Sequence, residues 1–137
     1  MKQKILIVDD EENILFVTKA AFIQTYEVFT AGSGPAAIEV IKRERPDFIF
    51  LDIKMPGMSG IEVLEVIGGL EVRPIVWMLT GDDDLDTATK TLRAGASGYI
   101  TKPFDLAQLR EVVTGALESS AGEKPPSEKP WRVKKKK

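Results

Sequence analysis

"DFIFLDIKMPGMSG", residues 47–60, joins a run of apolar residues to a loop rich in glycine and proline. The apolar run has no polar alternation, which is typical of a strand buried on both faces of a parallel sheet. Asp52 stands where this strand ends. The fold and the search for a functional site therefore both begin from this carboxylate.

Other short apolar runs along the chain predict four more strands. These are residues 4–9, 27–31, 74–80 and 98–101. Stretches with helical spacing of apolar residues follow each strand. The predicted helices are residues 11–24, the segment after Ser33, the segment from Ser59 to Gly69, residues 82–95 and residues 105–120.

Capping residues support these helix assignments. Ser33, Ser59 and Asp105 each precede a helical stretch and are preferred N-terminal caps, while Gly95 is a typical stop signal. In the first helix the expected apolar stripe consists of Ile14, Val17 and Ala21, with Leu15 and Phe22 beside them.

Strands and helices alternate five times with short connections. This pattern predicts an α/β fold, a (βα)5 three-layer sandwich with a parallel sheet. The expected fold is flavodoxin-like, and the strand order 2-1-3-4-5 is taken from that known arrangement, of which a bacterial response regulator is an example, rather than worked out from the sequence. In such sheets ligands gather beyond the carboxyl ends of the strands. The crevice lies where strands 1 and 3 send their connections to opposite faces.

The composition limits both size and chemistry. With 137 residues the chain has room for one ordinary domain, assigned to residues 1–119. Residues 120–137 carry 7 basic and 2 acidic side chains and lack apolar periodicity, so we expect a disordered basic tail or linker there. The absence of cysteine and histidine excludes disulfides, thiolate or imidazole metal ligands and a serine-histidine-aspartate triad.

Five polar side chains follow strand ends and should meet at one edge of the sheet. They are Asp9, Asp10, Asp52, Thr80 and Lys102. Two unit charges about 4 Å apart repel by roughly 4 kcal/mol at an effective dielectric constant near 20, so grouped carboxylates require a cation. Lys102 and a magnesium ion would supply it, in a site suited to phosphoryl transfer. Asp52 would then be the nucleophile, and Thr80 would donate a hydrogen bond to the phosphoryl group.

Four segments together resemble the receiver (REC) domain of two-component response regulators. They are "ILIVDDE" (5–11), "DFIFLDIKMPGMSGIEVL" (47–64), "PIVWMLTG" (74–81) and "AGASGYITKPF" (94–104). The resemblance implies that Asp52 accepts a phosphoryl group from a sensor histidine kinase or a histidine phosphotransfer protein. It also implies that Asp9, Asp10, Asp52 and the Lys54 carbonyl hold Mg²⁺, and that Lys102 pairs with the phosphoryl group.

The resemblance further implies a conformational switch. Thr80 and Tyr99 would form the switch pair, and a cis peptide before Pro103 would direct Lys102 into the site. The switch would reshape the face made by residues 82–95, 98–101 and 105–120. Such a module is no enzyme in the ordinary sense, because it catalyses only its own phosphorylation and dephosphorylation.

The expected setting and partners follow from the same reasoning. We expect a cytoplasmic protein without membrane contact, since no apolar run approaches a membrane span. Direct nucleic-acid binding by this domain is not expected, although the tail ends in "VKKKK". An output domain, an effector protein and a phosphorylation-dependent homodimer stay open as alternatives.

Two other functions remain open from the residues alone. "GSGPAA", residues 32–37, follows a strand and fits the G-x-G-x-x-A fingerprint of dinucleotide-binding modules, with Asp52 placed as the ribose-binding acid. That interpretation leaves Asp9, Asp10 and Lys102 unexplained. The other alternative is a pseudo-receiver that keeps the fold for protein binding without phosphorylation.

Overall fold

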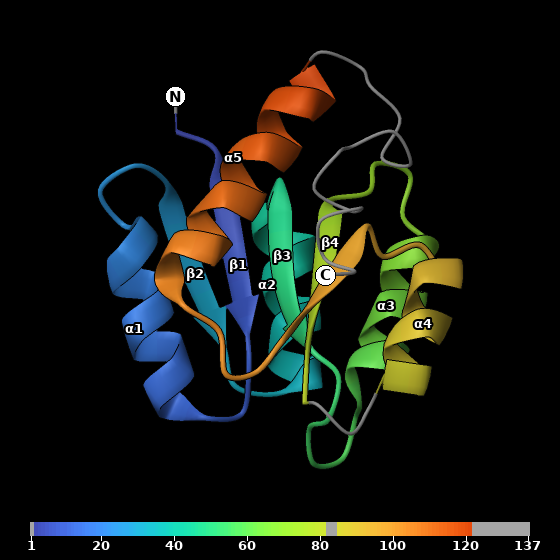
Figure 1. Ribbon diagram of the computed structural model, residues 1–137. Helices are drawn as coiled ribbons and strands as arrows, with labels where there is room; N and C mark the ends of the chain where they lie inside the picture. Colours follow the sequence, from blue (N-terminus) through green and yellow to red (C-terminus); the bar gives the residue numbers. More distant parts are fainter. Residues whose placement is uncertain (1, 82–84, 122–137) are drawn as a thin grey trace.

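The computed structural model describes residues 2–81 and 85–121, in which five strands alternate with five helices (Figure 1). The strands are β1 (Lys4–Val8), β2 (Glu27–Ala31), β3 (Phe48–Asp52), β4 (Ile75–Thr80) and β5 (Gly98–Thr101). The helices are α1 (Glu12–Phe22), α2 (Gly34–Glu44), α3 (Gly60–Gly68), α4 (Leu85–Arg93) and α5 (Leu106–Ala121). The predicted tail lies outside the described residues from position 122 onward.

All strand pairs are parallel, and the sheet order is β2-β1-β3-β4-β5. Both the predicted order and the flavodoxin-like α/β class are thereby confirmed. β1 and β3 lie side by side, with Val8 opposite Leu51 in the register. The carboxyl ends of these two strands therefore reach the same edge of the sheet, at the foot of Figure 1.

The sheet separates two apolar layers because successive residues of a strand face opposite sides. Ile5 and Ile7 of β1 pack in the cluster under α1 and α5, whereas Leu6 and Val8 pack in the cluster under α2, α3 and α4. Figure 1 shows the same division, with α1 and α5 on one face of the sheet. The helices after β1 and β3 thus lie on opposite faces, which opens the crevice between these strands.

Helix ends agree with the capping signals. The Ser33 and Ser59 hydroxyls accept hydrogen bonds from the backbone N–H groups three residues later, and Asp105 accepts one from the Gln108 N–H at 2.7 Å. Glu62 completes a capping box by accepting from the Ser59 N–H at 2.9 Å. Gly95, with φ of +119°, follows α4 in a conformation that favours glycine.

The predicted apolar stripe of α1 is partly wrong. Val17 is 41% exposed, and the residue buried in its place is Thr18. Leu15, Ala21 and Phe22 do pack against the core. The helix is therefore rotated so that its buried side is centred nearer Thr18 and Phe22 than Val17.

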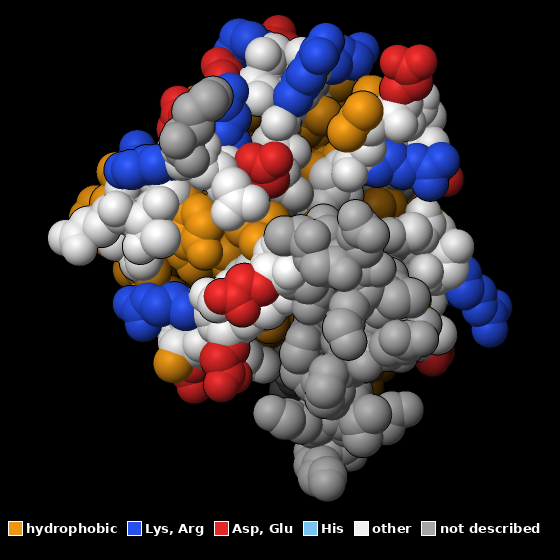
Figure 2. Space-filling view, turned by 90° about the horizontal axis from the view of Figure 1, so that it is seen from above, with side chains coloured by type: hydrophobic (Ala, Val, Ile, Leu, Met, Phe, Trp, Pro, Cys, Tyr) orange, Lys and Arg blue, Asp and Glu red, His pale blue; other side chains and the backbone are white. Residues whose placement is uncertain are grey.

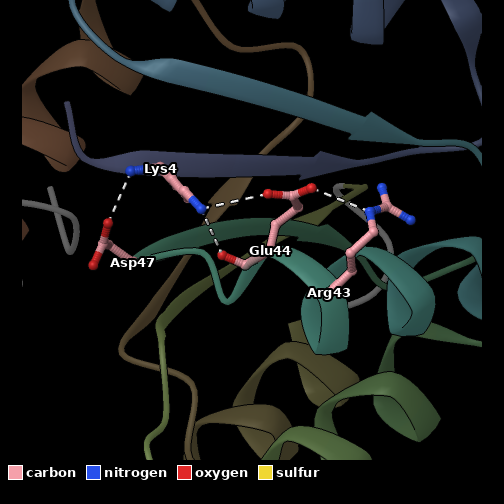
Figure 3. A network of polar contacts seen from close by, with 4 residues as sticks. All are labelled: Lys4, Arg43, Glu44 and Asp47. Carbon is pink, nitrogen blue, oxygen red and sulfur yellow. Dashed lines mark hydrogen bonds and ion pairs between the residues drawn. The ribbon is translucent and has the colours of Figure 1, made fainter. Parts of the chain in front are cut away.

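Polar contacts fix the opposite end of the sheet, where the strands begin (Figure 3). The Lys4 N–H donates to Asp47 Oδ2 at 2.8 Å, while Lys4 Nζ contacts the carbonyl and the carboxylate of Glu44 at 3.2 and 3.4 Å. Arg43 Nε pairs with the other oxygen of Glu44 at 3.1 Å. These contacts hold the connection from α2 to β3 against the start of β1.

The surface at this end carries charges of both signs around exposed hydrophobic side chains (Figure 2). A cavity of about 750 Å³ lies here, and Lys42, Arg45, Asp47, Leu70 and Leu117 are among its lining residues. Over residues 2–81 and 85–121, none of the helices has the length and apolar character needed to cross a membrane.

Candidate phosphoryl-acceptor site

The carboxyl edge of the sheet brings four predicted site residues together. Asp9 and Asp10 follow β1, Asp52 is the last residue of β3, and Lys102 follows β5. Backbone hydrogen bonds fix two of these positions, because the Asp9 N–H donates to the Ala31 carbonyl at 3.1 Å and the Lys102 N–H donates to the Thr80 carbonyl at 2.7 Å. The sheet itself therefore positions the group.

Three carboxylates form the acidic part of the site. Oxygen atoms of Asp9, Asp10 and Asp52 all lie within 4.8 Å of one another. Asp9 is completely buried and Asp52 is 4% exposed, whereas Asp10 faces solvent. The change from an apolar run to a loop suggested that Asp52 would be exposed to solvent. The structure shows instead that its side chain is buried.

Lys102 is the cation that approaches these carboxylates. Its Nζ atom lies 2.8 Å from Asp9 Oδ2, 3.3 Å from Glu11 Oε1 and 3.6 Å from Asp52 Oδ1. Burial alone would lower the pKa of Lys102, but the hydrogen bond with Asp9 and the charges of Asp52 and Asp9 outweigh burial and raise it. The ammonium group therefore stays charged inside the site.

The single positive charge of Lys102 does not neutralise three carboxylates. The pKa of Asp52 reflects the negative charge that remains. Burial and the neighbouring charge of Asp9 raise the pKa of Asp52 to about 7, although Lys102 acts in the opposite direction. An elevated pKa means that the site favours a further positive charge, which either a proton or a metal ion can supply. The all-oxygen donor set fits a hard divalent cation such as Mg²⁺.

The remaining predicted residues lie around this group. Thr80 is buried at the end of β4, and its hydroxyl donates to the Gly81 carbonyl at 3.2 Å. Tyr99 is half-buried on β5 and pairs in register with Met78, so it projects to the same face of the sheet as Thr80. The Lys102–Pro103 peptide is cis, and Lys54 is exposed on the loop after β3.

Glu11 is the residue at this site that sequence reasoning did not select. It directly precedes α1, and its backbone N–H donates to Asp9 Oδ1 at 2.9 Å while its side chain pairs with Lys102. An acidic residue at the start of a helix is favourable in any protein. The sequence therefore held no signal that would separate Glu11 from an ordinary helix-start residue.

Similarity to known proteins identifies the family of this chain. The response regulator receiver domain family matches residues 5–114. The chain belongs to this family. Receiver domains of two-component response regulators are signalling modules, which agrees with a site built from acids, a lysine and a hydroxyl rather than from a classical catalytic triad.

Curated relatives of the receiver domain differ in length. Regulatory protein AtoC of Escherichia coli (strain K12) is 39% identical over 116 residues, which cover 84% of this chain and 25% of AtoC. Sporulation initiation phosphotransferase F of Bacillus subtilis (strain 168) is 36% identical over 114 residues, covering 82% of this chain and 92% of that protein. The chain thus corresponds to a quarter of one relative and to nearly all of another.

Solved structures agree with the sequence relatives. The crystal structure of a CheY-like response regulator receiver domain protein from Methanospirillum hungatei JF-1 matches with a TM-score of 0.84 and 34% identity. The match covers 90% of this chain and all of that one. The signal receiver domain of a Luxo repressor protein from Vibrio parahaemolyticus matches with a TM-score of 0.83 and 28% identity, over 90% of this chain and 95% of that one.

The "GSGPAA" segment has a packing role in this receiver domain. Gly34 is buried, and a Cβ atom built on it would lie 2.7 Å from Cγ of Met58. The glycine therefore makes room for a side chain of the protein itself. Together with the family match, this contact favours the receiver interpretation over the dinucleotide-binding one.

Proposed function

We propose that Asp52 accepts a phosphoryl group from a sensor histidine kinase or a histidine phosphotransfer protein, in a Mg²⁺-dependent reaction that switches the conformation of the domain. The observation that carries the proposal is the meeting of Asp9, Asp10, Asp52 and Lys102 at one sheet edge, where the pKa of Asp52 is raised to about 7. The negative charge of Asp52 is only partly neutralised, which favours a bound Mg²⁺ ion. The same ion would neutralise charge on an incoming phosphoryl group.

In this reaction a carboxylate oxygen of Asp52 forms a bond to phosphorus. The bond between phosphorus and the donor nitrogen breaks, and the donor imidazole keeps the electron pair. Lys102 Nζ, 3.6 Å from Asp52 Oδ1, is placed to neutralise charge on the phosphoryl oxygens. Asp9, Asp10, Asp52 and the Lys54 carbonyl would hold Mg²⁺, which supplies further charge neutralisation when bound.

The proposed switch begins at Thr80. Its hydroxyl now donates to the Gly81 carbonyl, and in the phosphorylated protein it would donate to a phosphoryl oxygen instead. Tyr99, on the same face of the neighbouring strand, would turn inward as Thr80 moves. Tyr99 belongs to β5, which lies between α4 and α5 in the chain, so the surface of α4, β5 and α5 is where a signal would be read.

The proposed phosphodonor would dock beside the site on α1. This helix begins two residues after Asp10, and its outer side exposes Phe16 and Val17, of which Phe16 is 76% exposed. Ile23, directly after the helix, is exposed as well. A large exposed aromatic side chain close to an acceptor site suits a partner protein that must bring phosphohistidine to Asp52. The output would lie in a further domain or in an effector protein, as the greater length of AtoC suggests.

The direct test uses acetyl phosphate and Mg²⁺ as the donor mixture. Intact-mass measurement should show one added phosphoryl group on the wild-type chain, and Asp52→Asn should abolish it. Asp86→Asn, which removes an exposed carboxylate from the first turn of α4, is the matched control and should be modified like the wild type. An unmodified wild-type chain would refute phosphoryl acceptance.

A further inference from the structure

Gly60 closes a tight contact between the start of α3 and the acceptor strand. Its N–H donates to the Ile53 carbonyl at 2.8 Å, which folds the loop of residues 54–59 back onto the end of β3. A Cβ atom built on Gly60 would overlap the carbonyl oxygen of Asp52, and it would lie 3.0 Å from the Asp52 carbonyl carbon and from Ile53 Cα. Gly60 is therefore required for reasons of space.

This contact differs from those at the other glycines of the region. The atoms that crowd Gly60 belong to the backbone of β3, so no side-chain rotation can relieve an added methyl group. At Gly34 the crowding atoms are those of the Met58 side chain, which has rotatable bonds. At Gly68, the last residue of α3, a Cβ atom would meet nothing within 4 Å.

The backbone at Asp52 is fixed from its other sides by the sheet. β3 lies between β1 and β4, and the Ile53 N–H donates to the Leu79 carbonyl at 3.0 Å. The start of α3 supplies the remaining support. Displacement of this backbone would move the Asp52 carboxylate relative to Asp9 and to Lys102 Nζ, which now lies 3.6 Å from Asp52 Oδ1.

We propose that Gly60 is a positioning residue for phosphoryl acceptance. Because it has no side chain, α3 begins directly against the Asp52 backbone and holds the acceptor carboxylate opposite Lys102. The inference rests on the proposed function of Asp52. A misplacement of about 1 Å at reacting atoms can cost about a hundredfold in rate, so Gly60→Ala should slow phosphorylation by about tenfold to a hundredfold.

The experiment compares three glycine-to-alanine variants of the full chain. Initial rates of phosphorylation by acetyl phosphate are measured at saturating Mg²⁺, and each rate is divided by the folded fraction from circular dichroism. Gly68→Ala should keep the wild-type rate, because it adds a methyl group to open space in the same helix. Gly34→Ala should lose stability with little change in rate per folded molecule, since Met58 can move and the site is not involved.

The kinetic parameter that changes distinguishes a positioning role of Gly60 from an effect on stability alone. Gly60→Ala should lower the maximal rate per folded molecule and leave the acetyl phosphate concentration for half-maximal rate unchanged. A folded Gly60→Ala variant with the wild-type maximal rate would overturn the proposal. Absence of phosphorylation in the wild type would instead refute the proposed function.

A second measurement needs only the wild-type chain and covers the case in which Gly60→Ala does not fold. Amide hydrogen exchange is followed at Gly60 and Ile53, whose N–H groups donate to Ile53 and Leu79 respectively. Protection similar to that of the central residues of β3 is expected if the contact persists in solution. Exchange of the Gly60 amide as fast as that of an unprotected loop amide would overturn the proposal.

Discussion

At the scale of single residues, Asp52 links the chemistry of the site to the stability of the fold. Its pKa is raised from an ordinary value of 3.8 to about 7, first by burial and then by the charge of Asp9. Between these pH values the folded protein binds a proton that the unfolded chain has already released. The contribution of Asp52 to stability is therefore complete below about pH 3.8 and is lost as the pH rises to about 7.

Asp52→Asn should for this reason stabilise the metal-free protein at alkaline pH. The shift of about three pKa units corresponds to an upper limit of about 4 kcal/mol in the free energy of unfolding. Urea unfolding in EDTA, from about pH 4.5 to about pH 8.5, should show a gain over the wild type that grows with pH. A gain that is independent of pH would contradict the raised pKa of Asp52.

Thr18 is a second residue with a measurable consequence. It is 1% exposed, and its hydroxyl has no hydrogen-bond partner among the described residues. Valine has nearly the same shape without the polar group, so Thr18→Val should raise the free energy of unfolding by about 1 kcal/mol. Thr89→Val on α4 is the control, because the Thr89 hydroxyl is exposed and donates to the Leu85 carbonyl at 3.0 Å. Equal effects of the two substitutions would contradict this explanation.

At the scale of secondary-structure elements, the end of α2 carries local strain. Arg45 follows the helix in the left-handed conformation, with φ of 51° and ψ of 64°, which glycine adopts more easily. Arg45→Gly should raise the free energy of unfolding by about 0.5 kcal/mol, despite the larger entropy of glycine in the unfolded chain. Lys42→Gly, inside the last turn of the same helix, should lower it by about 1 kcal/mol.

Thermal unfolding of the two variants checks this contrast. Arg45→Gly should melt above the wild type and Lys42→Gly below it, although both remove an exposed cation from the same helix end. Equal melting temperatures for the two variants would show that the backbone conformation at position 45 does not affect the free energy of unfolding.

The helices also show how far the sequence could lead. Strand positions and most helix ends followed from apolar runs and capping residues, because these signals act over a few neighbouring residues. The predicted sheet order comes from the known flavodoxin-like arrangement. The buried side of α1 did not follow, since apolar residues surround the helix from Ile14 to Ile23 and more than one stripe fits the spacing. Packing against β1 and α5 decides the orientation, and this information lies outside the helix itself.

The site shows the same limit. The meeting of Asp9, Asp52 and Lys102 could be predicted because parallel strands end at one edge. The burial of Asp52 could not, because an apolar run that leads into a loop does not show how closely the rest of the folded chain covers its last residue. Nor could the pairing of Glu11 with Lys102, because Glu11 lies beyond the strand end, directly before α1, where an acidic residue is favourable in any protein.

At the scale of the whole molecule, metal binding and folding should be coupled. The three carboxylates come together only in the folded chain, so Mg²⁺ should bind the folded state in preference to the unfolded one. At a concentration about a hundredfold above its dissociation constant, a ligand adds about 2.7 kcal/mol to the free energy of unfolding. The melting temperature should therefore rise by several degrees in excess MgCl₂.

A charge-matched pair of variants makes this test specific. Asp10→Asn should reduce the rise in melting temperature, whereas Glu65→Gln should keep it, because Glu65 is an exposed residue of α3 outside the acidic group. Sodium chloride at equal ionic strength controls for screening of surface charges. The same rise in all three proteins would mean that Mg²⁺ acts elsewhere on the molecule.

The indole ring of Trp77 projects from β4 into the apolar layer under α1 and α5, and it is completely buried. Gly98 on the adjacent strand β5 leaves room for the ring, since a Cβ atom at Gly98 would lie 2.6 Å from it. An indole group so well removed from water emits light at short wavelength. Trp77 and Trp131 are the two tryptophans of the chain, so Trp131→Phe would leave Trp77 as the single emitter. The spectrum of that variant would then report loosening between β4 and β5 without any attached dye.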